Sequence, residues 1–449
     1  MTFLPSAAST GASRNLLSRT NICGTEEHLS FERGPFPSLE QLHDNRSDGA
    51  KEVFLGSHRT VAPSETVARV NKLMSRMGIT RVANVTGLDR IGVPVVMVCR
   101  PNARSLAVSQ GKGIDLAAAA ASGLMEAAEL YHAEHIDLPL KLGSYFELSH
   151  SHAFVDVDRL PKVYDIPFDQ NLVTLWIEGV DLFSGTSRWV PFESVRTNFT
   201  LPLPPGSGYF DCSSNGLASG NTMVEAVCHA ICEVVERDAT ALWNRIPSKD
   251  RARTGLNLDS VADETCREVL GKLERAKFDV TAWETTSDVD VPAFFCLITD
   301  RRNPRNHHGV GAGAHPAPGI ALLRALTEAI QVRTTYISGA RDDLLPEEYT
   351  ETERARKARV AARLRAEHLP ERDFGAIPDR SSDNFADDLA WLLARLRAVD
   401  VREVVAVDLS KSWLGLSIVR VVVPGLEGPD DHDAYVPGER ARRLLGGAS

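Results

Sequence analysis

The apolar positions of residues 213–243 recur with the period of a helix. After Asn221 the segment contains neither Pro nor Gly, so it predicts about six unbroken helical turns. Its apolar face is formed by Val227, Ile231, Val234, Val235 and Leu242. Glu225, Glu233 and Glu236 lie within roughly 80° of one another on the opposite face. Such a row of carboxylates is either a solvated face of an amphipathic helix or a site for a cation.

Residues 115–135 form a second predicted helix. It carries Glu126 and Glu129, which are one turn apart. The preceding Gly111–Gly113 segment predicts a flexible loop with one cation, Lys112. This part of the chain therefore supplies two carboxylates and an ammonium group within a short stretch.

Residues 319–338 form a third predicted helix. One stripe of it, within about 60°, is formed by Arg324, Glu328, Gln331 and Thr335. Leu322 and Leu326 belong to the apolar positions that cover much of the other side. Each of the three helices thus presents a narrow carboxylate stripe with Arg, Asn or Gln nearby. Because oxygen-rich clusters suit Mg²⁺ and phosphate clamps use such groups, the three stripes together favour a Mg²⁺–phosphate site over three solvated faces.

The remaining segments alternate between short strands and helices, which indicates the α/β class. The glycine-rich residues 309–314 lack the spacing of a dinucleotide-binding fingerprint and instead predict a close strand-to-helix approach. Further predicted helices are residues 70–77, 268–276, 351–367 and 386–399. Predicted strands are residues 93–101, 172–180, 187–195, 278–286, 292–300, 403–409 and 416–426.

Composition is that of an ordinary globular protein. The chain has 449 residues, of which 43% are hydrophobic and 24% charged, with a net charge of −10. It has no long Lys/Arg run, so we expect no nucleic-acid partner. No apolar run reaches roughly 18 residues, so we expect no membrane span. The seven cysteines are odd in number and scattered, which favours a reducing, cytoplasmic location.

Two groups of Cys and His are weaker metal candidates. Cys228, His229 and Cys232 lie near the acidic helix face, but small apolar side chains packed beside the site are the simpler interpretation. No CxxC pair exists that would make a zinc site. The three His residues within 307–315 are interpreted as loop residues rather than ligands.

Asn221 and Glu225 form an N-x-x-x-E pattern, and Glu233, Glu236 and Arg237 follow as E-x-x-E-R. In this combination the helix resembles the corresponding helix of the YcaO-domain family. The blocks that carry the resemblance are residues 56–70, 111–134, 213–239 and 313–344. Together they extend over most of the chain.

The resemblance implies an open α/β fold with an internal pseudo-repeat and ATP bound between acidic helices. It implies one YcaO-like ATP-binding catalytic domain at residues 56–439. Residues 1–55 would be an irregular N-terminal extension, and residues 440–449 a C-terminal tail.

The resemblance also implies an activity and its cofactors, ATP and Mg²⁺. Family members use ATP to activate a peptide-backbone amide oxygen by phosphorylation, after which a nucleophile attacks the amide carbon. A neighbouring Cys, Ser or Thr side chain gives an azoline, and sulfide gives a thioamide. Phosphorylation suits this chemistry because it turns a poor leaving group into a good one, which leaves the protein mainly to position the reactants and neutralise charge.

The family's roles map onto matching positions of this chain. The Mg²⁺ positions are Glu126, Glu129, Glu225, Glu233, Glu236 and Glu328. The nucleotide contacts are Asn221, Arg237 and Arg324, together with Ser57 and Lys112, whose loops vary in length within the family. Arg237 and Arg324 are also the catalytic positions, since they offset charge that develops during transfer. Gln331 is added to the predicted nucleotide contacts because it lies on the same helical stripe as Arg324 and Glu328, and the family resemblance does not assign it.

The C-terminal residues distinguish between reactions. Azoline-forming members commonly end in a P-x-P-x-P tail, whereas Pro424, Pro429 and Pro437 are too far apart for that motif. We therefore expect thioamide formation on a ribosomally made peptide or protein. The alternatives are an azoline-forming cyclodehydratase and a non-catalytic nucleotide-binding accessory protein for ribosomal-protein methylthiolation.

Partners follow from the same resemblance. The first 55 residues are too polar to predict a leader-binding domain, so a partner protein is expected. A TfuA-like protein would fit thioamide formation, and an E1-like or ThiF-like protein would fit azoline formation. A homodimer is the expected oligomer.

Overall fold

The computed structural model describes residues 50–54, 56–430 and 435–446, so most of the predicted N-terminal extension lies outside the described part. These described residues all belong to one structural unit. Within it, β1 (Glu52–Phe54) pairs with β2 (Ser57–Arg59) in an antiparallel arrangement. The predicted domain boundary at residue 56 therefore falls between two paired strands.

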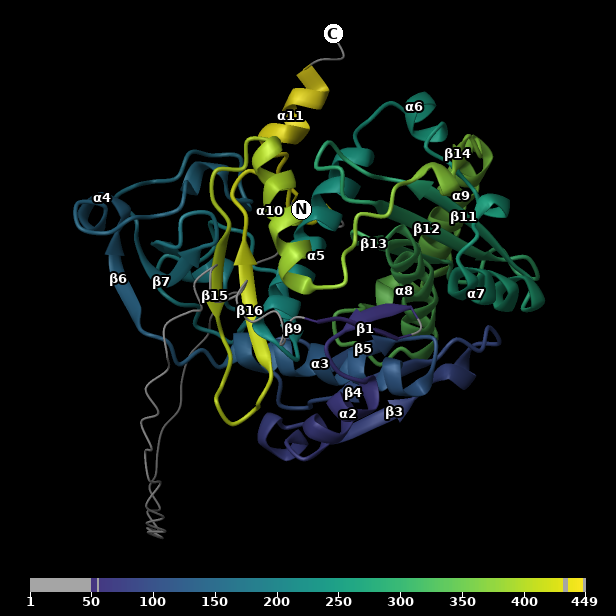
Figure 1. Ribbon diagram of the computed structural model, residues 1–449, viewed down its shortest axis with the longest axis horizontal. Coiled ribbons are helices and arrows are strands. Elements are labelled where there is room, and N and C mark those ends of the chain that lie inside the picture. The colour runs from purple at the N-terminus through teal and green to yellow at the C-terminus, as the bar shows by residue number, and fades with distance from the viewer. Residues whose placement is uncertain (1–49, 55, 431–434, 447–449) are drawn as a thin grey trace, which may run out of the picture. The chain divides into compact units, whose positions relative to one another are not determined.

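Three strand–helix units carry the long acidic helices (Figure 1). Each unit has a short strand, a connection of a few residues and a long helix. The units are β5 (Val108–Lys112) with α3 (Leu116–Glu134), β9 (Leu217–Gly220) with α5 (Met223–Trp243), and β13 (Gly309–Ala314) with α8 (Pro318–Ser338). All three predicted helices are confirmed, and the one expected after Asn221 begins at Met223, directly after β9.

Local sequence explains where these helices begin. The Asp115 carboxylate accepts the backbone N–H of Ala118 at the start of α3, and the Thr222 hydroxyl accepts that of Glu225 at the start of α5. Helix α8 begins with Pro318, whose fixed φ and missing N–H suit a first helical position. These caps set the register of each helix and hence the direction of its carboxylates.

Glycines in the strands allow each helix to lie against its own strand. A Cβ atom at Gly311 would lie 2.4 Å from the carbonyl oxygen of Ala325 in α8. A Cβ at Gly111 would lie 2.0 Å from the carbonyl oxygen of Ala119 in α3. The predicted close approach of the glycine run is confirmed. The predicted flexible loop is wrong for Gly111 and Lys112, because glycine here provides helix–strand contact inside β5 rather than a turn.

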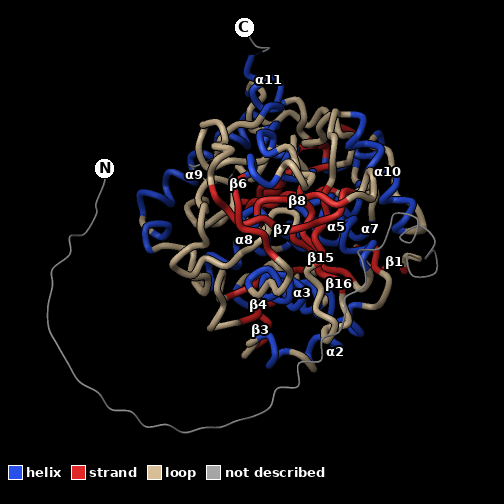
Figure 2. Tube along the Cα trace, turned by 90° about the vertical axis from the view of Figure 1, so that its left-hand side faces the viewer, coloured by secondary structure: helices blue, strands red, loops and turns tan. Residues whose placement is uncertain are grey.

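The strands form three main antiparallel sheets. Their hydrogen-bonded orders are β3 (Arg81–Asn84)–β4 (Val95–Cys99)–β5, β11 (Phe278–Glu284)–β12 (Ala293–Asp300)–β13, and β6 (Leu140–Ser144)–β7 (Val173–Asp181)–β15 (Val405–Asp408)–β16 (Ser417–Val422)–β9. Strand β8 (Ser187–Pro191) pairs with β7. Figure 2 shows strands of the largest sheet running side by side. In each sheet, the strand that precedes an acidic helix is the last in the order.

The three units close on one another. Helix α3 packs against β9 as well as β5, α5 packs against β13 as well as β9, and α8 packs against β5 as well as β13. Each helix therefore contacts the strand of the next unit. This cyclic packing repeats one strand–helix arrangement three times, and it points the three acidic helices toward a common interior.

The other elements surround these units. They are α2 (Pro63–Asn71), α4 (Tyr145–Leu148), α6 (Ser248–Ala252), α7 (Glu264–Arg275), α9 (Glu351–Glu367), α10 (Phe385–Ala398), α11 (Glu439–Gly446), β10 (Leu256–Asn257) and β14 (Arg372–Asp373). The helix expected at residues 70–77 is wrong as a continuous element. Helix α2 ends at Asn71, and Met74–Met77 form a separate 3₁₀ turn before Gly78 at φ +69°.

Candidate active site

One cavity of about 870 Å³ lies among the three acidic helices. All six predicted Mg²⁺ positions line it, namely Glu126, Glu129, Glu225, Glu233, Glu236 and Glu328. Ser57, Lys112, Arg237, Arg324 and Gln331 line it as well. Asn221 is the one predicted site residue that does not belong to its lining. Segments nearly 300 residues apart in the sequence therefore meet in one space.

Asn221 fixes Glu225 rather than facing the cavity. Its side-chain nitrogen donates to Glu225 Oε1 over 3.4 Å, and its oxygen accepts from the Thr66 hydroxyl over 3.0 Å. The other carboxylate oxygen of Glu225 accepts from the Thr60 hydroxyl over 2.6 Å and from the Thr60 backbone N–H over 3.2 Å. Glu225 is thus held in one orientation by Asn221, just before its own helix, and by Thr60, just after β2.

Strand β13 holds carboxylates from two helices. The backbone N–H of Ala312 donates to Glu328 of α8 over 3.4 Å, and that of Ala314 donates to Glu236 of α5 over 3.2 Å. Lys112 forms a 2.8 Å ion pair with Glu328. Burial acts to raise the pKa of Glu328, but the charges of Lys112 and Arg237 outweigh it and lower that pKa. Glu328 is therefore ionised more readily than an isolated glutamate.

Other carboxylates of the cavity have raised pKa values. Burial raises the pKa of Glu233 to about 7, and the neighbouring charge of Glu236 adds to the effect. Burial also raises the pKa of Glu236, whose carboxylate lies 3.6 Å from Arg237. Within the described residues, no hydrogen-bond donor is found for the Glu233 carboxylate. These groups would gain from a cation placed among them.

The two glutamates of α3 follow the same pattern. Burial raises the pKa of Glu126, although its carboxylate accepts the Gln110 backbone N–H over 3.3 Å. Burial, with Glu233 and Glu126 nearby, raises the pKa of Glu129 well above its usual value. The Ser219 hydroxyl of β9 donates to Glu129 over 2.5 Å. This contact ties the first unit to the second at the cavity wall.

The donor set fits Mg²⁺ that is bound together with phosphates. In the described part of the chain, no group of three His, Cys, Asp or Glu side chains forms a ready metal cage. Mg²⁺ commonly uses one or two carboxylates and completes its octahedron with water and substrate phosphates. Six carboxylates spread around one cavity match that mode, because several ions could each take one or two of them.

Four residues of the site were not singled out from the sequence. Arg59 and Arg341 line the cavity, and both lie in blocks that carried the family resemblance. Gln110 also lines it, from within β5. Arg420 is 1% exposed and donates to the carbonyl oxygens of Val195, Ser213 and Asn215. The sequence offered no signal for Arg420, because it stands among the apolar residues of β16.

Arg420 lies behind the carboxylates as a buried cation without a carboxylate partner among its hydrogen bonds. Burial lowers its pKa to about 10, whereas the charges of Glu233 and Glu129 act in the opposite direction. The side chain remains protonated at neutral pH. It holds the segment before β9 in place and adds positive potential behind Glu129 and Glu233.

Histidines and cysteines near the cavity are buried or stacked on neighbouring side chains. Burial lowers the pKa values of His229 and His315 well below the usual range, so both are neutral at neutral pH. Burial raises the pKa of Cys232 to about 12, so its thiol stays protonated. His307 stacks on Tyr336 with ring centroids 4.5 Å apart.

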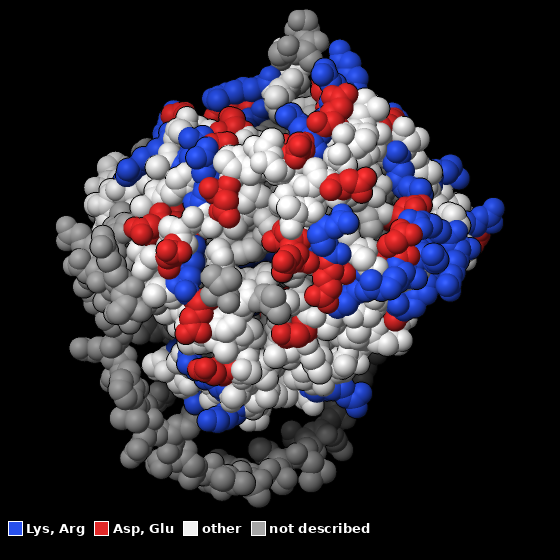
Figure 3. All heavy atoms as spheres, turned by 45° about the vertical axis from the view of Figure 1, so that its right-hand side comes forward, with Lys and Arg blue, Asp and Glu red and all other residues white. Residues whose placement is uncertain are grey.

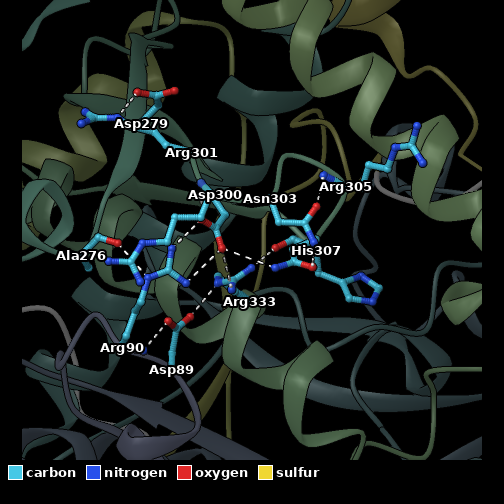
Figure 4. Close-up of polar contacts among 12 residues, drawn as sticks. Asp89, Arg90, Ala276, Asp279, Asp300, Arg301, Asn303, Arg305, His307 and Arg333 are labelled. Carbon is cyan, nitrogen blue, oxygen red and sulfur yellow. Dashed lines mark hydrogen bonds and ion pairs between the residues drawn. The ribbon is translucent and has the colours of Figure 1, made fainter.

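A buried ionic network fixes α8 from its other side (Figure 4). Arg333 of α8 donates to Asp89 over 2.6 Å and lies 3.7 Å from Asp300 at the end of β12. Arg90 donates to Asp300 over 3.0 Å. Because the network joins α8 to two sheets, it sets the position from which Glu328 and Gln331 reach the cavity.

Sequence comparison identifies the family to which these features belong. The chain matches the model of the YcaO cyclodehydratase family, described as ATP- and Mg²⁺-binding, over residues 110–427. It is 34% identical over 422 residues to a Rhizobium leguminosarum bv. trifolii protein described as an uncharacterized protein in the tfuA 3′ region, which covers 92% of this chain and 99% of that protein. The chain therefore belongs to the YcaO family.

A more distant relative is the ribosomal protein S12 methylthiotransferase accessory factor YcaO of Escherichia coli strain K12. The two are 26% identical over 302 residues, which covers 61% of this chain and 49% of the relative.

Structure comparison confirms the predicted fold class. YcaO from Methanopyrus kandleri, solved with AMPPCP and Mg²⁺, has a TM-score of 0.67 at 24% identity and covers 84% of this chain and 95% of its own. A heterocyclase solved with substrate and cofactor has a TM-score of 0.66 at 23% identity and covers 86% of this chain, while this chain spans 55% of that one. In the described residues, no helix is both long and apolar enough to cross a membrane.

Proposed function

We propose that this chain uses ATP and Mg²⁺ to activate a peptide-backbone amide, and that it forms a thioamide. The observation that carries the proposal is the convergence of six glutamates from three helices on one cavity. A family described as ATP- and Mg²⁺-binding supports the choice of ligand. When bound, ATP supplies the phosphoryl group that turns the amide oxygen into a leaving group.

The chain's own residues then divide the work. The six glutamates would hold Mg²⁺, and through it the phosphates. Lys112, Arg237 and Arg324 are placed to offset negative charge, since each lines the same cavity. Ser57 lines it too and is assigned to the nucleotide. Asn221 acts through Glu225, which it positions by a hydrogen bond. Burial of Glu225 and Glu236, which are 6% and 7% exposed, keeps competing water away from the centre.

One observation favours sulfide as the nucleophile. The Rhizobium leguminosarum relative is described by its place in the tfuA 3′ region, which supports a TfuA-like partner here. Pro429 and Asp430 line the cavity, and Asp430 is tied to Arg245 over 2.7 Å. This segment therefore forms a fixed wall beside the proposed reaction centre.

A second candidate function is that of a nucleotide-binding accessory protein. It is favoured by the similarity to the Escherichia coli accessory factor, although that match covers only 49% of the relative. An azoline-forming cyclodehydratase is a third candidate, in keeping with the family's description. Under each of these three functions we propose a cytoplasmic location for the protein, since the six described cysteines are free.

Intact-mass analysis separates these candidates. The purified chain is incubated with ATP, Mg²⁺, sulfide and peptides encoded by neighbouring genes, with and without a TfuA-like partner. Exchange of oxygen for sulfur in a peptide supports thioamide formation, whereas loss of one water indicates an azoline. ATP binding without any mass change in every peptide would contradict both and favour the accessory function. Glu236→Gln serves as the inactive control, and light scattering tests the expected homodimer.

A further inference from the structure

Two buried amide side chains in the cavity have unused hydrogen-bonding capacity. Gln110 of β5 is 2% exposed and Gln331 of α8 is 9% exposed. Gln331 Nε2 lies 3.4 Å from Gln110 Oε1 as donor to acceptor, and the Thr335 hydroxyl also donates to that oxygen. Gln110 Nε2 and Gln331 Oε1 are left without a protein partner in the described structure. Unpaired polar atoms at this depth are costly, which points to a ligand that completes them.

The pair offers one free donor beside one free acceptor. Turning both amides over exchanges the two atoms but leaves the same combination, because one N–H···O bond always joins the two side chains. An extended peptide presents the N–H and the C=O of one residue along the same edge. The free atoms of Gln110 and Gln331 complement that edge, much as a neighbouring strand would.

The position of the pair distinguishes a peptide from a nucleotide base. The Gln110 backbone N–H donates to Glu126, and Gln331 follows Glu328 by one helical turn, so both amides border the carboxylate centre. In the proposed reaction, the amide that is activated must touch the terminal phosphate held at that centre. The edge of the adenine base is separated from the terminal phosphate by ribose and the other phosphates. A peptide therefore fits this place better than the base.

We infer that Gln110 and Gln331 bind the main chain of the substrate peptide beside the amide that reacts. This inference rests on the proposed function and moves Gln331 from the nucleotide to the peptide. Thr335 acts as a positioning residue, since it holds the Gln110 amide. Recognition of this kind does not depend on the side chains of the peptide. Discrimination between peptide sequences must therefore come from other contacts.

Gln331→Met and Gln110→Met test the inference, because methionine keeps the length of the side chain and removes its hydrogen-bonding groups. Gln170→Met is the matched control, since Gln170 is exposed and its backbone carbonyl, not its side chain, accepts the Phe146 N–H. Melting without ligand should be unchanged or raised in both cavity variants, because unpaired buried polar atoms are removed. A lower melting temperature in both would show that the pair is structural and would overturn the inference.

Binding is measured directly, without turnover. The peptide probe is acetyl-pentaglycine amide, which has no side chains, and its fully N-methylated counterpart has no backbone N–H donors. Saturation-transfer NMR in the presence of Mg²⁺ and AMPPCP should show binding of the first probe and little of the second. Each cavity variant should weaken binding of the first probe on the order of tenfold, as expected for a lost partner in a buried pair. AMPPCP affinity should stay within about twofold of wild type, and Gln170→Met should match wild type throughout.

Three results would overturn the inference while leaving the proposed function intact. They are a probe that does not bind wild type, a probe that binds the variants equally well, and variants that lose AMPPCP affinity while keeping the probe. The last result would show that Gln331 binds the nucleotide rather than the peptide. A wild-type protein that does not bind AMPPCP with Mg²⁺ would sink the proposed function itself, and the inference with it.

Discussion

Helices α5 and α9 are both long and charged, yet they use their charges in opposite ways. In α5, the carboxylates of Glu225 and Glu236 are almost fully buried and line the cavity. In α9, Ala361 is the buried residue, and Glu353 and Arg356 pair with each other on the surface. Figure 3 shows such exposed Lys and Arg atoms interleaved with Asp and Glu. The number of charges therefore says little about function.

The difference comes from the opposite face of each helix. The apolar face of α5 packs with Leu389 and Leu392 of α10 in a hydrophobic core. That packing forces the acidic stripe of α5 inward, toward the other units. Helix α9 has no continuous apolar stripe, so its charges stay in water and form pairs one turn apart. Carboxylates opposite an apolar face are thus the more informative pattern.

The largest effect is expected at the buried carboxylates. Glu233→Gln should lower ATP turnover by about 10²–10³-fold, because a group that holds the metal and its phosphates is lost. Melting should not fall, since a buried charge is removed. Glu353→Gln in α9 is the matched control and should keep full turnover. A Glu233→Gln protein with wild-type turnover in a coupled ATPase assay would show that the buried carboxylates of α5 are no more important for turnover than the exposed ones of α9.

The next effect concerns the network that positions α8. Asp300→Ala should destabilise the protein by about 3–5 kcal/mol, because it removes the buried carboxylate that Arg90 and Arg333 share and leaves Arg333 with Asp89 alone. Removing Glu353 from its exposed pair with Arg356 should change stability far less, because water screens that pair. Urea unfolding measures both. Equal losses in the free energy of unfolding would show that a buried ion pair contributes no more to stability here than an exposed one.

The close packing of strand and helix gives a third test. Gly311→Ala should cost about 1–3 kcal/mol, since its Cβ would meet the α8 backbone. Gly87→Ala is the control, because no atom lies within 4 Å of the added Cβ. Thermal melting of the two variants should differ clearly. Similar melting would mean that β13 can move away from α8 at little cost.

The smallest effect is a pH dependence of opposite sign in the two helices. Burial raises the pKa of Glu233 to about 7 from 4.5, so the folded state holds a proton that the unfolded state has lost. Stability should therefore fall as pH rises from about 4.5 to 7. The Glu233→Gln protein lacks this titrating group, so wild type should lose stability relative to it over this pH range.

For Glu353, the hydrogen bond from Arg356 lowers the pKa, so its contribution is present above the usual pKa and is lost as pH falls. Urea titrations at pH 5 and pH 8 without ligand check both signs. A wild-type protein that gains stability relative to Glu233→Gln as pH rises would contradict the burial of this carboxylate.

Much of the site was predictable because helical periodicity is local. The stripes of α3, α5 and α8 follow from residues three and four apart, and the motif with Glu233, Glu236 and Arg237 identified the family. Gln110 was missed, because a polar residue in a short strand gives no sign of the direction in which it points. Asn221 was assigned to the nucleotide, whereas the structure shows it holding Glu225. Both depend on neighbours from distant parts of the chain.

The sequence by itself determined that three helices carry narrow carboxylate stripes, and that the glycine run at residues 309–314 would meet a helix backbone closely. Only the tertiary structure decided that the three units close in a cycle and that their glutamates share one cavity with Lys112, Arg59 and the amide pair. The physical reason is that side-chain direction along a helix is set by the local backbone. The orientation of one helix relative to another is set by the packing of cores and sheets whose residues are hundreds of positions apart in the sequence.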